Sequence, residues 1–245
     1  ILPFENKGAP EDAFYAYGIV ADLISDVTGA GLIRVAGLKD VEKIDHTSLS
    51  YDEMSKVLLV RYVAQGTLWK LGSMFQLSLE IFDTQLSKVI YTKRWQTQWE
   101  ELTTIKDDLS SNILETLKIE VDRKEEKTIP INPEAYEFYL KGKYTWEKTK
   151  SASETKVALG LLKKAVEIDN KLIAANRLIG GIYWQSGDEK KMKKAKEIHY
   201  EALEKAKEIG NKEEVGEGLR MIGYYHADDK DYEKAYELYK QAEQI

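Results

Sequence analysis

Three kinds of side chain in this sequence could do chemistry: histidines, a serine close to a lysine, and clustered acids. The histidines are His46, His199 and His226. None has a second ligand three or four residues away, the spacing at which a helix presents two ligands to one metal ion. Because His199 and His226 also fall where paired helices pack large side chains, we expect packing rather than metal binding.

Ser153 lies three residues before Lys156, which matches the minimal Ser-x-x-Lys pattern of some acyl-transfer enzymes. The companion motifs are absent, and the sequence contains neither Gly-x-Ser-x-Gly nor Gly-x-x-x-x-Gly-Lys. A serine at the start of a helix is more simply an N-cap, and we interpret Ser153 in that way. A hydrolase that uses Ser153 or another serine stays a rival hypothesis.

The remaining chemical patterns are incomplete. The acidic stretch 228–231 lacks the glycine and the distant glutamate of a calcium loop, which favours a solvated turn. Gly29-Ala30-Gly31 lacks the third glycine of a dinucleotide loop and follows a helix, which favours a helix end. We therefore expect no cofactor and no catalytic activity. One helical stretch mixes lysines and glutamates, as a solvated face does; the residues are Lys190, Lys191, Lys193, Lys194, Lys196, Glu189, Glu197, Glu201, Glu204 and Glu208.

The composition limits the kinds of partner. The 245 residues carry a net charge of −6, with 15 Lys and Arg against 21 Asp and Glu in residues 1–130, and 21 against 21 in residues 131–245. Neither half offers the basic surface that nucleic acid requires. Cysteine is absent, which excludes disulfides and thiolate chemistry, and no apolar run is long enough to span a membrane. The sequence begins within an apolar run and ends within a helical pattern, so we expect a piece of a longer protein.

Residues 1–119 contain apolar residues at the spacing of a helix in some stretches and at the alternation of a strand in others. Apolar residues at helical spacing from Phe14 to Val27 predict a helix, and the alternation from Phe75 to Ile81 predicts a half-buried strand. We expect an α+β fold whose first domain is β-α-β-α-β-β-β-α, with helices packed on a mixed sheet. The elements expected are strands over 1–4, 32–36, 63–69, 75–81 and 89–95, with Val89, Tyr91, Lys93 and Trp95 on one face, and helices over 11–29, 51–58 (capped by Ser50) and 100–117.

Residues 120–132 are charged and lack apolar periodicity, which predicts a linker, and residues 133–245 are helical throughout. Three alanine pairs, each seven residues apart, recur after 37 and 40 residues, and a glycine precedes each pair. A period near 40 with paired helices is typical of a solenoid, because stacked copies cover the apolar face that one helix pair leaves open. The residues are Ala158 and Ala165, Ala195 and Ala202, Ala235 and Ala242, with Gly142, Gly180 and Gly223.

These copies resemble tetratricopeptide repeats. The matching residues are Ile179-Gly180, Tyr183, Gly187-Asp188, Ala195 and Ala202 in the second copy, Ile222-Gly223, Tyr232, Ala235, Tyr239 and Ala242 in the third, and Gly142, Ala158, Leu162 and Ala165 in the first. The resemblance implies an all-α solenoid of about three repeats that binds a protein or peptide partner.

Residues 1–119 resemble the TolB amino-terminal-like domain that precedes such repeats in bacterial signalling proteins. The matching residues are Leu2-Pro3-Phe4-Glu5-Asn6, Gly18-Ile19, Asp22-Leu23-Ile24, Val60-Arg61-Tyr62-Val63, Gly66 and Ile81-Phe82-Asp83, followed by Asn132-Pro133-Glu134-Ala135-Tyr136. The turn over 84–87 departs from the family because it lacks a glycine. The resemblance implies a sensory region attached to an adenylate cyclase, kinase or winged-helix output domain, or a layout like that of CadC-like regulators.

In such repeats the first helix of each pair lines a groove, and we expect the partner to bind there. Beside the packing stripe of the second repeat, Arg177, Gly181 and Trp184 are spaced to point into the groove. Arginine beside aromatic rings suits an extended peptide. The alternative is that Trp184 packs against the next repeat and the arginines are solvated. The matching positions elsewhere are Tyr139, Lys143, Trp146, Arg220, Tyr224 and Ala227.

Two functions from different classes stay open. The favoured one is a non-enzymatic protein-interaction and sensory module, and the alternative is a small-molecule sensor with its ligand in the first domain or at the domain junction. The family's layout favours an extracytoplasmic location over a cytoplasmic one, with a membrane anchor upstream of this region. The sequence leaves open the ligand, homo-oligomerisation and any repeats beyond Ile245.

Overall fold

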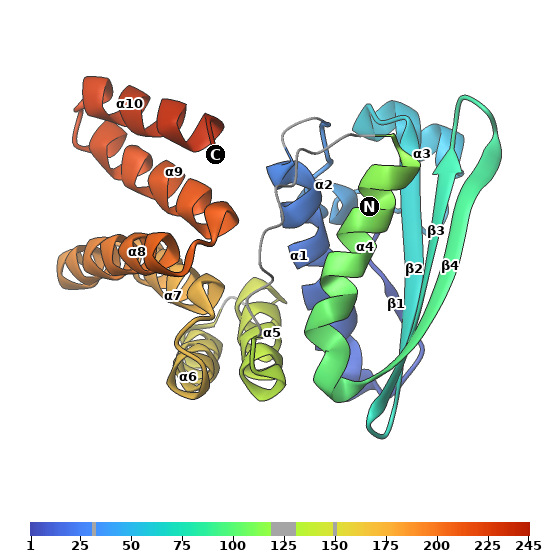
Figure 1. Cartoon of the computed structure of the whole chain (residues 1–245), viewed down its shortest axis with the longest axis horizontal. Helices are drawn as coiled ribbons and strands as arrows, with labels where there is room; N and C mark the ends of the chain where they lie inside the picture. The colour runs from blue at the N-terminus through green and yellow to red at the C-terminus, as the bar shows by residue number, and fades with distance from the viewer. Residues whose placement is uncertain (31–32, 119–130, 149–150) are drawn as a thin grey trace. The chain divides into compact units, whose positions relative to one another are not determined.

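The chain forms two compact units, residues 1–124 and 125–245. This computed structural model describes residues 1–30, 33–118, 131–148 and 151–245 (Figure 1). The division falls within the predicted linker, 120–132, most of which lies outside the described residues. A four-stranded mixed sheet followed by a helical region confirms the α+β class.

The first unit is built on a sheet with the strand order β1-β2-β3-β4. Strand β1 runs parallel to β2, and the other neighbours are antiparallel. The predicted alternation is confirmed in β3, where every second side chain from Phe75 to Asp83 is buried. The strands are β1 (Glu5–Asn6), β2 (Tyr62–Leu71), β3 (Met74–Asp83) and β4 (Lys88–Gln98).

Two long helices, α1 (Ala13–Gly29) and α4 (Leu102–Thr116), cover the apolar face of this sheet (Figure 1). Their apolar stripes form the core with the strands, because alternate strand residues present one continuous hydrophobic surface. The short helix α3 (Tyr51–Leu58) packs on β2 through Met54 and Val63. Ser50 and Glu53 form a complete capping box at its start, as the prediction of a Ser50 cap requires.

Three predictions for this unit are wrong. No strand forms over the described residues 33–36, and the chain instead makes a short helix, α2 (Leu38–Glu42). The first strand begins at Glu5 rather than at Ile1. The register shift between Ile81 and Phe82 places Val89 opposite Phe82 and Tyr91 opposite Ile81, so Val89 and Tyr91 face opposite sides of the sheet. The prediction that alternate residues share one face of the sheet fails here, because an extra residue in one strand inverts the alternation of side chains beyond it.

In the described residues 131–148 and 151–245, the second unit forms three consecutive helix pairs, each packed against the next (Figure 1). All six alanines of the predicted pairs are buried. A Cβ at Gly142 would lie 2.7 Å from Leu162 Cγ, and one at Gly223 would lie 2.8 Å from Tyr239 Cε1. The glycines therefore stand where the paired helices approach most closely. The helices are α5 (Pro133–Lys148), α6 (Ala152–Ile168), α7 (Ile173–Gln185), α8 (Glu189–Ile209), α9 (Lys212–Asp228) and α10 (Tyr232–Glu243).

The helix ends correct one prediction and confirm another. Ser151, not Ser153, caps α6, because the Ser151 hydroxyl accepts a 3.2 Å hydrogen bond from the Glu154 N–H. Ser153 is an exposed residue of the first turn. The acidic stretch 228–231 is a turn between α9 and α10, as expected, and Asp231 caps α10.

Candidate interaction surface

An ion pair joins the first helices of the second and third pairs. The guanidinium of Arg177 on α7 donates from Nε and Nη2 to the two carboxylate oxygens of Glu214 on α9, at 3.1 and 3.3 Å. Glu214 is held in place because it is the N3 residue of α9, where its own N–H donates to the capping side chain of Asn211. The side chain of Glu214 is 9% exposed and that of Arg177 is 29% exposed.

The charges around Arg177 fix its protonation state. Burial alone would lower the pKa of Arg177, but the Glu214 carboxylate outweighs this through its charge and hydrogen bonds, and the pKa lies above its ordinary value. Tyr139 on α5 and Glu217 on α9 act in the same direction. Arg177 is thus a permanent cation that lies within the electrostatic reach of side chains on both neighbouring first helices.

His199 on α8 is buried beneath this ion pair. Its Nε2 is 2.8 Å from the backbone carbonyl oxygen of Arg177, and its Nδ1 is bonded to the Tyr225 hydroxyl. A carbonyl only accepts, so Nε2 carries the proton in the neutral ring, and the Tyr225 O–H donates to Nδ1. Burial, together with the Arg177 charge, lowers the pKa of His199. Both ring nitrogens are engaged, which fits the packing role predicted for His199.

Aromatic rings continue the surface along α7 and α9. Trp184 packs on Tyr225 with centroids 4.4 Å apart and meets Tyr224 edge-on at 6.1 Å. Lys196 on α8 lies over Trp184 and Tyr225, and it pairs with Asp229 at 2.7 Å. Trp184 therefore packs against the next helix pair, as the alternative left open from the sequence held, but Arg177 pairs with the buried Glu214 and is not simply solvated as that alternative also held. Tyr224 is 49% exposed.

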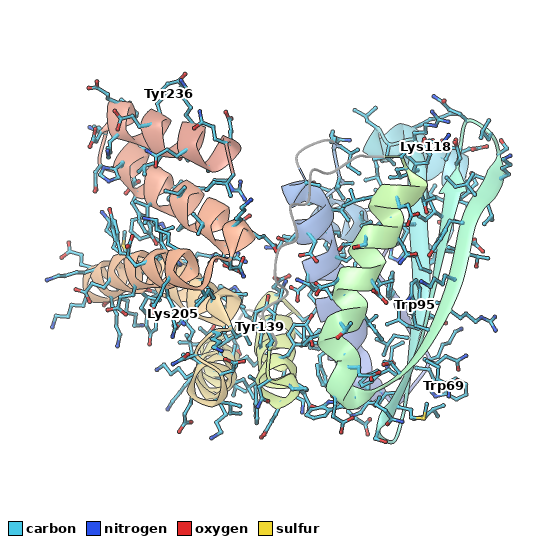
Figure 2. The ribbon with its side chains drawn as sticks, in the orientation of Figure 1. Trp69, Trp95, Lys118, Tyr139, Lys205 and Tyr236 are labelled. Atoms are coloured by element: carbon cyan, nitrogen blue, oxygen red, sulfur yellow. The ribbon has the colours of Figure 1, made fainter. Side chains whose placement is uncertain are left out.

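The structure brings most of the predicted groove residues together. Tyr139 is buried on α5 (Figure 2), and Lys143 lies over its ring at 5.7 Å. Arg220 is exposed and pairs at 2.6 Å with Glu217, the same residue that acts on Arg177. Trp146 is partly exposed, and within the described residues it makes no ring or ion contact with the others.

Sequence reasoning missed the residues that hold this surface in place. These are Glu214 and Tyr225, which supply its buried polar contacts together with His199, whose packing role was predicted. Of the missed residues only Glu214 carried a usable signal, the Asn-x-x-Glu spacing of a helix start that it forms with Asn211. Among the residues that the structure describes, no three His, Asp or Glu side chains are grouped to hold a metal ion. In the same residues, no helix is long and apolar enough to cross a membrane.

Comparison with known proteins gives one relative. No family model matches the chain. The sequence is 23% identical over 188 residues to a protein of Rhizobium meliloti (strain 1021) named "Putative adenylate cyclase 3". The alignment covers 72% of this chain and 31% of that protein, so the chain spans about a third of the relative's length.

Proposed function

We propose that this chain is a non-catalytic protein-interaction and regulatory region of a signalling protein. The similarity to part of a protein named as an adenylate cyclase supports the signalling context. We assign the first unit to the TolB amino-terminal-like domains and the second to tetratricopeptide repeats. Paired helices with buried alanines, and glycines set against large side chains, support the second assignment.

One observation carries the proposal: α5, α7 and α9 present cations and aromatic rings above a buried polar network. Arg177 uses Nε and Nη2 for Glu214, which leaves Nη1 to donate to a ligand. Arg220 and Tyr224 add a second guanidinium and a half-exposed ring on α9. This combination suits an extended peptide with acidic and apolar residues, because guanidinium groups bind carboxylates and rings cover apolar side chains.

The geometry favours binding over catalysis at this surface. The buried His199 has both nitrogens occupied and lies 2% exposed, so it cannot take a proton from a substrate without breaking the network. The permanent charge of Arg177 likewise excludes it as a base.

The test is a peptide selected by display on the full chain and measured by calorimetry. Arg220→Ala and Tyr224→Ala should each weaken binding by about 1–3 kcal/mol, as hot-spot side chains do. The matched control is Tyr236→Ala, which removes an even more exposed tyrosine (67%) from α10 (Figure 2) and should leave the affinity unchanged.

Equal affinities for all three variants would place the partner elsewhere and refute this surface. A metabolite that raises the melting temperature, with no peptide selected, would instead favour the small-molecule sensor.

A further inference from the structure

The solvent face of α8 changes sign along its length. Its exposed charges are lysines over residues 190–194 and glutamates over residues 197–204, and the sign is reversed again at the two ends, at Glu189 and Lys207. The two ends follow the helix dipole, which favours acids at the N-terminus and bases at the C-terminus, because Glu189 lies in the first turn and Lys207 in the last. The exposed residues of α8 are Glu189, Lys190, Lys191, Lys193, Lys194, Glu197, Tyr200, Glu201, Glu204, Lys207 and Glu208.

A hollow of about 190 Å³ lies beside the basic half of α8, between α6, α7 and α8. Lys163 and Lys194 converge there, with each Nζ between 5.8 and 5.9 Å from the ring centroid of Tyr183. Within the described part of the chain, neither lysine has a carboxylate partner. The floor is apolar and includes Ile179 and Ile198. The hollow thus suits an acidic side chain with an apolar stem.

A shallower depression lies beside the acidic half of the same helix. It is lined by Tyr200, Glu201, Glu204, Lys205 and Glu208, and Figure 2 labels Lys205 on α8. Tyr200 is exposed, so this half offers an aromatic ring flanked by carboxylates. These are the features that the basic hollow would accept.

We propose that this face binds a second copy of the chain, with the two α8 helices antiparallel about a two-fold axis near Glu197. Lys194 of each copy then lies opposite Glu201 of the other, and Lys190 lies opposite Glu204. The overlap of residues 190–204 is about 22 Å long at 1.5 Å per residue. Because a two-fold axis repeats every contact, the basic hollow of each copy receives the acidic half of the other.

The proposal is independent of the peptide surface on α5, α7 and α9. The two-fold axis brings the Glu197 carboxylates of the two copies close together. The positive charges of Lys193 and Lys194 from both copies flank these carboxylates. Exposed ion pairs are individually weak and are screened by salt, so the dimer should be weak and should dissociate as the ionic strength rises.

Sedimentation of the full chain over a concentration series tests this. At low salt, the average mass of the wild type should rise from 28.1 kDa toward twice that value, and 0.5 M salt should weaken dimerisation roughly tenfold or more. Lys163→Glu/Lys194→Glu should abolish dimerisation, and so should Glu201→Lys/Glu204→Lys. The matched control, Lys171→Glu/Lys240→Glu, reverses two exposed lysines away from this face and should dimerise like the wild type.

Mixing the two inactive variants gives the decisive result. In the mixture, the hollow of Lys163→Glu/Lys194→Glu is acidic and meets the lysines at positions 201 and 204 of the other variant. The second contact of the dimer joins an unchanged basic hollow to an unchanged acidic half. A one-to-one heterodimer should therefore form. A wild type that stays monomeric at every concentration would overturn the proposal. Dimerisation of either charge-reversed variant alone, or failure of the mixture to associate while circular dichroism shows folded chains, would also overturn it.

Discussion

Replacing Gly180 with alanine tests how α7 packs on α8. The added Cβ would lie 2.7 Å from Cε1 of the buried His199 ring, a distance that real Cβ contacts do not reach. The ring must therefore move, and its bonds to the Arg177 carbonyl and the Tyr225 hydroxyl must lengthen or break. Gly180→Ala thus disrupts both hydrogen bonds of the His199 ring by adding a single methyl group.

The expected change in stability has three contributions. Overpacking costs about 1–3 kcal/mol, and each weakened hydrogen bond adds roughly 0.5–1.5 kcal/mol. The better helix propensity of alanine offsets about 1 kcal/mol of this loss in stability. With two hydrogen bonds weakened, the net expectation is a loss of about 1–5 kcal/mol in the free energy of unfolding of the helical unit.

The adjacent Gly181 provides the matched control. A Cβ at Gly181 meets nothing within 4 Å, so Gly181→Ala should stabilise the same helix by up to about 1 kcal/mol. Urea unfolding followed by circular dichroism gives the free energies, and amide hydrogen exchange in α7 assigns the transition to the helical unit. In the His199→Ala background the cost of Gly180→Ala should disappear. If Gly180→Ala is as stable as Gly181→Ala, the packing argument is wrong.

Four further predictions concern charge, capping and the first unit. Burial lowers the pKa of His199 below its ordinary value of 6.5 in the folded chain, so the unfolded chain binds the proton more tightly and protonation favours unfolding. The contribution of His199 to the free energy of unfolding should be fully present above about pH 6.5 and should decrease as the pH falls below it. The decrease should be smaller in His199→Gln. Arg177→Ala leaves the Glu214 carboxylate buried without its cation and should cost about 1–3 kcal/mol, which adding Glu214→Gln should partly restore in thermal melts. Ser50→Ala should cost about 1 kcal/mol through loss of the capping box. Residues 1–119 alone should fold, as circular dichroism will show, because α4 completes the core of that unit.

Hydrophobic period and capping residues were enough to predict most elements. The short helix 51–58 was predicted to the residue because Ser50 marks its start, and β3 was predicted because alternate side chains of a half-buried strand are apolar. The stretch 33–36 was misassigned because β-branched residues favour a strand, whereas a strand also needs a neighbour to bond. The bulge in β4 has no local signal in Val89 or its neighbours.

The candidate surface was predictable only in outline. Helical spacing placed Arg177 and Trp184 on one side of α7, but it does not say which side chains of α9 meet them. Their partners Glu214 and Tyr225 lie 37 and 41 residues away in sequence. Such contacts depend on how one helix pair is set against the next, and spacing within one helix carries no information about that.

The contacts of Arg177 and Trp184 with α9 determine which substitutions can test peptide binding directly. Arg177 and Trp184 stabilise the array themselves, one through the buried Glu214 and the other through Tyr225, so their loss would weaken a partner by disturbing α9 even if neither touched it. Arg220 and Tyr224 lie on the outer side of α9 with much of their surface exposed, and their removal leaves no buried charge and no cavity. A loss of affinity in these two variants, at an unchanged melting temperature, therefore separates direct contact with a peptide from support of the surface that the peptide would use.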